Sequence, residues 1–257
     1  MPLTYVPLRE RPARRLPQLF TGLALYGFSL SLMVRAGLGL APWSVLSEGI
    51  AHRSALSFGT LTTLVGAGVL LLWIPLRQRP TFGTFANILT VGWFSDLGLW
   101  LLPAGPGPTA RAALFAAGVL VNGFSIAVYV GARCGPGPRD GLMTGLTAWT
   151  GRSLRVVRTG IELVVLAVGW LLGGSVGLGT VLYAVTVGAV TQYCLPRFTY
   201  RAERDRADQD RAERHRLDRH RLDRDGDGRD GDGRDRGAAP TRRTRRPSAA
   251  SDPAPGH

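Results

Sequence analysis

The sequence of 257 residues contains no lysine and only two cysteines, Cys134 and Cys194. A phosphate-binding loop of the Walker type requires a lysine, so that class of site is excluded. Two scattered cysteines are too few for a metal site or a disulfide framework, and we expect them to pack as small apolar residues. The four histidines do not cluster. The sequence therefore predicts no catalytic centre, no metal and no cofactor, and we expect that the protein is not an enzyme.

Acidic residues are scarce in the first 196 residues, which hold five acids and 14 arginines, whereas the last 61 residues hold 13 acids and 17 arginines. A helix needs about 20 apolar residues to cross the ~30 Å hydrocarbon layer of a membrane. The first 196 residues contain apolar runs of about this length, and these runs are apolar on all sides, unlike the one-sided pattern of a soluble helix. The sequence thus predicts an all-α membrane protein with about six transmembrane helices, near residues 17–36, 58–76, 83–102, 111–130, 156–173 and 178–195.

Composition divides the chain into an N-terminal arm (1–16), two membrane halves (17–102 and 103–196) and a tail rich in arginine and aspartate (197–257). The arginines gather on the arm, on alternate connections and on the tail. By the positive-inside rule, both termini are predicted to lie in the cytoplasm, on the inner face of the plasma membrane. We expect a disordered tail with no specific nucleic-acid partner, because its sequence has low complexity.

An internal repeat relates the two halves. A shift of 96 positions lays residues 19–98 on 115–194 without gaps, and Gly27-Phe28-Ser29 then falls on Gly123-Phe124-Ser125. Each half holds three spans, an odd number, so the second half must enter the membrane upside down. Inverted repeats of this kind recur in secondary transporters. The sequence therefore predicts two inverted three-helix repeats.

Each half also contains a short segment between its first two spans, "GLGLAPWSVLSEGIAH" and, 96 residues later, "RCGPGPRDGLMTGLTA". Proline favours the first position of a helix, because its missing N–H has no partner there. The helical part would run about 11 residues, or ~16 Å, which is half a bilayer. We predict a re-entrant or interfacial half-helix in each half, whose backbone is shaped by Gly39, Pro42, Gly135, Pro138 and Gly141.

Two interpretations of these segments stay open. In the first, both helix N-termini face a small solute, anionic or carboxylate-bearing, and Ser44, Arg139 and Asp140 help to bind it. In the second, Ser44 and Asp140 cap free N–H groups, Arg139 anchors the chain at the cytoplasmic face, and Gly141-x-x-x-Gly145 packs against another helix.

Polar residues within the spans are further candidates for a binding site, because ionisable groups are costly inside a membrane. Arg158 and Glu162 are four residues apart on one helix face, so they can form an ion pair, with either a structural or a binding role. Asn87 and Asn122 are expected either to hydrogen-bond between helices or to line a path. Glu48 lies in the first short segment, where we expect a solvated position.

The motifs "GLGLAPWSVL", "GPGPRDGLM" and "AVGWLLGGSVGLGT" resemble those of the YczE/YitT-like bacterial integral membrane proteins, over roughly residues 17–196. Members often carry Asp after Pro-Trp, whereas this chain has Ser44. That departure weakens any idea of paired acids at positions 44 and 140. The resemblance implies a multi-pass plasma-membrane protein but supplies no substrate.

The leading hypothesis is a small permease or exporter-like transporter with its site between the paired short segments. Its expected partners are the lipid bilayer, a small solute and further copies of the chain in a homo-oligomer. The alternative is a non-transporting scaffold or regulator that acts through its cytoplasmic loops and tail.

Overall fold

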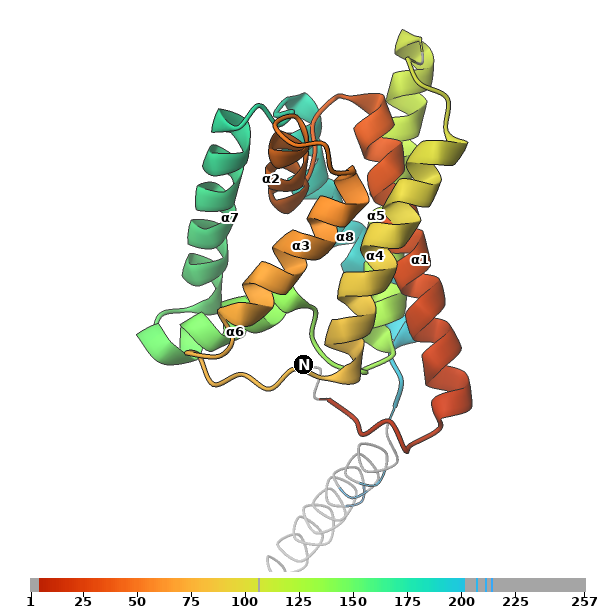
Figure 1. The fold of residues 1–257 in the computed structure, drawn as a ribbon. Coiled ribbons are helices and arrows are strands. Elements are labelled where there is room, and N and C mark those ends of the chain that lie inside the picture. The colour runs from red at the N-terminus through yellow and green to blue at the C-terminus, as the bar shows by residue number, and fades with distance from the viewer. Residues whose placement is uncertain (1–4, 106, 202–206, 208–210, 212–213, 215–257) are drawn as a thin grey trace, which may run out of the picture. The chain divides into compact units, whose positions relative to one another are not determined.

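The computed structural model describes residues 5–105 and 107–201, together with the single positions 207, 211 and 214. The chain divides into two units, Met1–Ala202 and Glu203–His257, and most of the predicted tail lies outside the described residues. In the described part the chain forms helices and no strand, which confirms the all-α prediction (Figure 1). The first unit contains α1 (Pro12–Ala36), α2 (Pro42–Ala51), α3 (Phe58–Leu71), α4 (Phe82–Leu101), α5 (Pro108–Gly131), α6 (Pro138–Thr150), α7 (Leu154–Leu171) and α8 (Leu178–Phe198).

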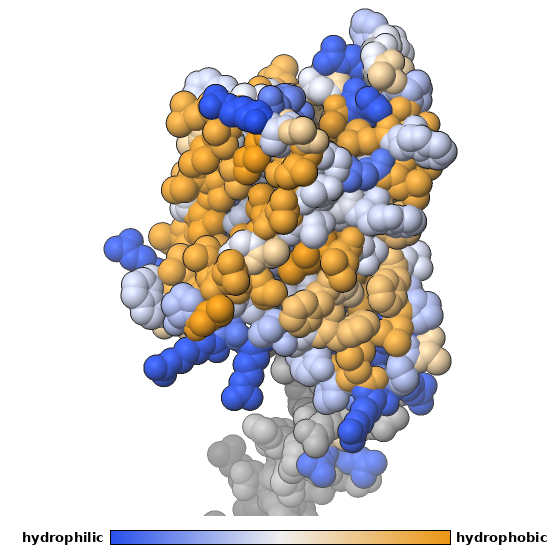
Figure 2. Space-filling model, in the orientation of Figure 1, coloured by the Kyte–Doolittle hydropathy of each residue, from blue (hydrophilic) through white to orange (hydrophobic). Residues whose placement is uncertain are grey.

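Each predicted span falls on one helix, and each predicted short segment falls on α2 or α6. Three of the helices, α1, α5 and α8, are long and apolar enough to cross a membrane. Helix α3 ends at Leu71, earlier than predicted, and tight turns continue to Arg77. Pro75 explains this early end, because proline has no N–H to donate and its ring clashes with the preceding helical turn. Figure 2 shows apolar side chains over much of the middle of one face, with charged residues mainly towards its two ends.

Helix α1 begins at Pro12, within the predicted N-terminal arm, and proline is suited to the first helical position. Arg15 in its first turns is fully buried, with 0% exposure. An unpaired charge would be costly there. The guanidinium instead donates hydrogen bonds to five backbone carbonyls, those of Val6, Pro7, Glu10, Ala132 and Arg133. It thereby ties the arm to the end of α5.

Arg111 makes the matching contact in the other direction. It lies 96 positions after Arg15, and its guanidinium donates to the carbonyl of Ala36 over 2.6 Å and to that of Gly37 over 2.9 Å. Ala36 and Gly37 themselves lie 96 positions before Ala132 and Arg133, two of the acceptors of Arg15. Each half thus provides an arginine that binds carbonyls at the end of the other half's first long helix, where cations are favourable.

The helices pack both within each half and across the two halves. Helix α1 packs against α5, and each of them also packs against the last helix of its own half, α1 on α4 and α5 on α8. Of the short helices, α2 packs on α7 of the second half and α6 on α3 of the first half (Figure 1). The two halves differ in one extensive contact. In the first half α3 packs against α4, whereas the corresponding helices of the second half, α7 and α8, make no comparable contact.

The start of α1 and the end of α8 lie at the same end of the helical unit. The Gln18 side chain donates to the carbonyls of Val128 and Phe198, at 2.9 and 2.7 Å. The amide of Tyr200 donates to the carbonyl of Gly131 over 2.8 Å. The N-terminal arm, the end of α5 and the residues after α8 therefore meet in one place.

Candidate functional site

Two glycines turn the chain just before the short helices. Gly39 has φ = 123° and Gly135 has φ = 124°, a backbone conformation that other residues rarely adopt. A Cβ atom at Gly39 would lie 2.7 Å from the Thr180 hydroxyl, and one at Gly135 would lie 1.7 Å from the Thr81 hydroxyl. Neither position has room for a side chain, so glycine is needed for its conformation and for its size.

Each turn is held by the last helix of the opposite half. The amide of Gly179, at the start of α8, donates to the carbonyl of Leu38 over 2.9 Å. The amide of Gly83, at the start of α4, donates to the carbonyl of Cys134 over 3.2 Å. Both donors and both acceptors are 96 positions apart. These reciprocal bonds fix where α2 and α6 begin.

A cavity of about 700 Å³ lies where the two short helices begin, and each of the helices α1 to α8 contributes to its lining. Its volume is within the range that is common for small-molecule sites. The first residues of α2 and α6 line it, among them Pro42, Trp43, Pro138, Arg139 and Asp140. The N-termini of both short helices therefore border the same space, which the repeat alone did not establish.

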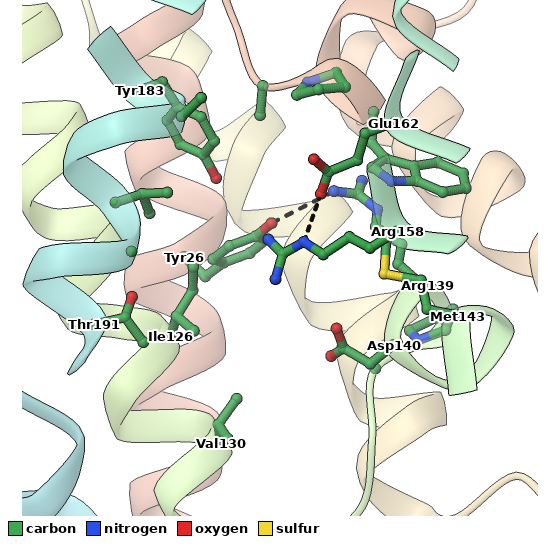
Figure 3. A pocket seen from close by; sticks show the side chains of 18 of the residues that line it. Tyr26, Ile126, Val130, Arg139, Asp140, Met143, Arg158, Glu162, Tyr183 and Thr191 are labelled. Atoms are coloured by element: carbon green, nitrogen blue, oxygen red, sulfur yellow. Dashed lines mark hydrogen bonds and ion pairs between the residues drawn. The ribbon is translucent and has the colours of Figure 1, made fainter. Parts of the chain in front are cut away.

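Charged groups occupy one side of this cavity (Figure 3). The Nε atom of Arg158 and a carboxylate oxygen of Glu162 are 2.9 Å apart, which confirms the predicted ion pair. The Arg139 guanidinium lies over the Trp43 ring, 5.2 Å from its centre, and 3.5 Å from the Tyr26 hydroxyl. Cation–π contacts of this kind are favourable but leave the charge without a counter-ion.

Arg139 and Asp140 have no oppositely charged partner within ion-pair distance in the part of the chain that the structure describes. The Asp140 carboxylate lies near the backbone of Gly137 and faces the cavity (Figure 3). The site thus holds one ion pair in direct contact and, on neighbouring residues, one cation and one anion without an ion-pair contact of their own.

The opposite side of the cavity carries no charge and mixes apolar and polar side chains. Ile126 and Val130 on α5 face the charged residues of α6 and α7 (Figure 3). Tyr183 and Thr191 on α8 add hydroxyl groups on that side. A molecule in the cavity would therefore have charged groups on one side and uncharged ones, partly apolar, on the other.

Five of the predicted site residues line the cavity together, namely Asn87, Arg139, Asp140, Arg158 and Glu162. Ser44 and Asn122 are not among the lining residues. Ser44 is buried, and its hydroxyl has no hydrogen-bond partner in the described part of the chain, so it does not cap α2. Asn122 donates to the Ser29 hydroxyl over 2.7 Å and accepts from the Tyr183 hydroxyl over 3.0 Å. It joins α5 to α1 and α8, as expected of an asparagine between membrane helices.

The prediction for Glu48 was wrong. Its side chain is buried, and its carboxylate accepts a hydrogen bond from the Ser175 amide in the connection between α7 and α8. Gly141 is closely packed, since a Cβ atom there would lie 1.9 Å from the Trp73 ring, but the contact is with the turn that follows α3 and not with a helix. Trp73 also donates to the Pro138 carbonyl over 2.9 Å. One short helix therefore packs through Gly141 and presents Arg139 and Asp140 to the cavity.

Sequence reasoning missed two aromatic residues of this region, Tyr26 and Tyr183. Tyr26 corresponds to Asn122 in the repeat, and Asn87 corresponds to Tyr183. The two halves thus exchange a tyrosine and an asparagine at two related positions. In the alignment of the two halves, each of these positions pairs a tyrosine with an asparagine. Neither pair is identical, so neither stands out as part of the repeat.

A comparison with known proteins identifies the family of the chain. A model described as a family of unknown function, DUF6198, matches residues 13–196, nearly all of the segment from α1 to α8. The chain belongs to this family. No solved structure matches the chain.

Three relatives match most of the chain. An uncharacterized protein of Haemophilus influenzae is 39% identical over 177 residues, which are 69% of this chain and 81% of the relative. The uncharacterized membrane protein YczE of Bacillus subtilis is 33% identical over 180 residues, 69% of this chain and 84% of its own. The uncharacterized protein YyaS of the same organism is 22% identical over 179 residues, 68% of this chain and 89% of its own. The chain is therefore a YczE-like membrane protein, and the YitT part of the resemblance stays a prediction.

Proposed function

We propose that the protein is a small transporter of the bacterial plasma membrane and that its solute binds in the central cavity. The observation that carries this proposal is the pair Arg139 and Asp140, two charges without ion-pair partners among the described residues, at the point where both short helices begin. Ionisable groups inside a membrane protein are costly and tend to be kept for function. Arg158 and Glu162 on the same side of the cavity are, in contrast, paired with each other.

The proposed topology has six membrane-crossing helices, α1, α3, α4, α5, α7 and α8, with the second three inverted relative to the first. Support comes from the reciprocal contacts of Arg15 and Arg111 and from the equal φ angles of Gly39 and Gly135. The arm and the end of α8 lie at one end of the unit, as an even number of crossings requires. The arginine-rich connections place that end in the cytoplasm.

The short helices α2 and α6 would enter the membrane without crossing it. Their 10 and 13 residues span about 15 and 20 Å, at 1.5 Å per residue. Irregular backbone at membrane depth is tolerated only where protein or water surrounds it. The turns at Gly39 and Gly135 satisfy this condition, because their neighbours bond to the starts of α8 and α4.

Transport requires the cavity to face each side of the membrane in turn. In the structure α3 is packed on α4 and α7 stands apart from α8, so the two halves have different conformations. If the halves exchange these conformations, the opening moves from one half to the other. Such an exchange is the usual consequence of an inverted repeat around a central site.

Accessibility of the cavity from both sides tests the proposal. Ile126→Cys, in a background with Cys134→Ala and Cys194→Ser, is treated with a membrane-impermeant thiol reagent in right-side-out and in inverted vesicles. A transporter predicts labelling from both sides. Arg152→Cys, on the exposed connection between α6 and α7, gives a one-sided reference. If Ile126→Cys reacts from one side only, a scaffold or regulator explains the protein better than a transporter does.

A further inference from the structure

The cavity has an opening between α7 and α8. In the first half, Gly92 on α4 packs so tightly on α3 that a Cβ atom there would lie 2.1 Å from the Thr63 hydroxyl. In the second half, the equivalent Gly188 on α8 has no atom within 4 Å of that position, although it lines the cavity. Its expected neighbour, Thr159 on α7, also lines the cavity. The gap between α7 and α8 thus leads into the site.

The part of this opening between Leu163 on α7 and Val181 on α8 is apolar and lies on the outer surface of the helical unit. Leu163 on α7 and Val181 on α8 both line the cavity, yet they are 61% and 63% exposed. Neighbouring residues on the same two helices, such as Val164 and Leu182, are also apolar and exposed. In the proposed topology this surface faces the hydrocarbon layer, since an apolar exposed surface suits lipid and not water.

Inside the opening, the free charges are of both signs. Arg139 and Asp140 are adjacent in the sequence, face the same cavity and have no ionic partners in the described part of the chain. Glu162 is neutralised by Arg158, so it adds no net charge. A ligand with only a negative group would contact Arg139 and leave Asp140 without a direct ionic contact. A ligand with one negative and one positive group compensates both.

The cavity is also larger than a charged headgroup alone requires. Its volume of about 700 Å³ leaves room beside the charged residues, and that room is bordered by apolar residues of α5, α7 and α8 such as Val130, Leu166 and Val187. An apolar chain fits this space and continues into the opening. A small hydrophilic zwitterion would leave these apolar residues without contacts to the ligand.

We propose that the cavity takes a zwitterionic amphiphile from the membrane, laterally between α7 and α8. Its anionic group binds the Arg139 guanidinium, its ammonium group binds the Asp140 carboxylate, and its apolar chain leaves past Leu163 and Val181. This inference rests on the proposed transport function and names the substrate class and the entry route for the same site.

Binding of three matched probes tests the substrate class. Native mass spectrometry of the full chain in a nonionic detergent measures the binding of lysophosphatidylethanolamine, a monoacylglycerol with the same acyl chain, and phosphoethanolamine without a chain. We expect one molecule of the zwitterionic amphiphile per protein, bound at least roughly tenfold more tightly than either of the other two. Arg139→Gln and Asp140→Asn should each weaken its binding by a similar factor, whereas Arg152→Gln, a surface change outside the cavity, should not.

The route is tested by filling the opening. Gly188→Trp places a large ring in an open space between α7 and α8, and we expect binding to weaken about tenfold or more. Gly160→Trp is the matched control, because Gly160 on α7 also has no neighbour within 4 Å but does not line the cavity. Equal binding by both variants would show that the apolar chain does not occupy the space between α7 and α8, and the proposed placement of the ligand would be wrong.

Other outcomes overturn the substrate class. Equal binding of phosphoethanolamine means that the chain is irrelevant, and equal binding of the monoacylglycerol means that the charges are irrelevant. Tighter binding after Asp140→Asn indicates an anionic ligand. If no probe binds but Ile126→Cys is labelled from both sides of the membrane, the protein transports a different solute. One-sided labelling with strong binding of the amphiphile would instead retain the site and reject transport.

Discussion

The two halves of the molecule have related sequences but different packing in one place. In the first half, α3 and α4 approach through two glycines, and a Cβ atom at Gly59 would lie 2.0 Å from the carbonyl oxygen of Gly92. In the second half, Arg155 takes the place of Gly59, and α7 and α8 stand apart. A long side chain at this position prevents the close approach that glycine permits. The cavity is therefore closed by the first half and open at the second.

The contacts that hold the fold together are shared by the two halves, whereas the charged residues of the site are not. Reciprocal contacts at Arg15 and Arg111, and at Gly39 and Gly135, are kept in both halves and hold the helices in place. The charges do not follow the repeat, since Arg139 and Asp140 correspond to Trp43 and Ser44. Backbone-shaping residues are thus symmetric, whereas the residues that border the cavity with charge are confined to the second half.

The largest effect is expected when the shared arginine contact is broken in each half. Arg15→Met removes a donor from five carbonyls, of which those of Pro7 and Arg133 keep a backbone donor, and each buried acceptor left unsatisfied costs about 1–3 kcal/mol. Arg111→Met leaves only two, nearer the surface, so its cost should be smaller. Thermal unfolding in detergent, followed by the reaction of the buried Cys134 thiol with a fluorescent maleimide in a Cys194→Ser background, compares the two variants.

Arg152→Met serves as the control for that comparison, because Arg152 is exposed on a connection. Equal losses from Arg15→Met and Arg111→Met would show that the N-terminal arm adds nothing to the contact.

The second prediction concerns the glycines on which the comparison of the halves depends. Gly92→Ala puts a methyl group against the Thr63 hydroxyl and the Gly59 backbone, and overpacking of this kind costs about 1–3 kcal/mol. Gly188→Ala meets open space and should leave the unfolding temperature unchanged or raise it slightly, since alanine favours helix by roughly 1 kcal/mol over glycine. The same thiol-based thermal unfolding measures both. A loss at Gly188 as large as that at Gly92 would mean that α7 and α8 are packed together.

Much of the helical architecture could be predicted from the sequence, because its signals are local. Apolar runs marked the long helices, and Pro42 and Pro138 marked the starts of α2 and α6. Arg15 and Arg111 lie just before the two segments in which the repeat is evident, 19–98 and 115–194. The same shift of 96 relates them, but their contacts could not be predicted from it.

The rest depends on contacts between distant segments. The burial of Glu48 follows from its bond to Ser175, 127 positions away. Trp73 packs on Gly141, whereas the equivalent contact in the other half pairs Gly169 with Val45, so large and small residues exchange places. The separation of α7 from α8 had one sequence signal, Arg155 at the position of Gly59, whereas glycine stands at both 92 and 188. The type of a residue does not by itself predict which distant residue it packs against.

The smallest expected effect tests whether the open half can close as the other half does. Thr159→Cys and Gly188→Cys, in a chain without Cys134 and Cys194, correspond to the closely packed Thr63 and Gly92. A closed state that is populated at about a tenth or less still accumulates as a cross-linked product under mild oxidation. Because Arg155 opposes the approach of α7 to α8, Arg155→Gly should increase the cross-linking rate, whereas Arg152→Gly should not. A rate that Arg155→Gly leaves unchanged would show that the difference between the halves has another cause than this side chain.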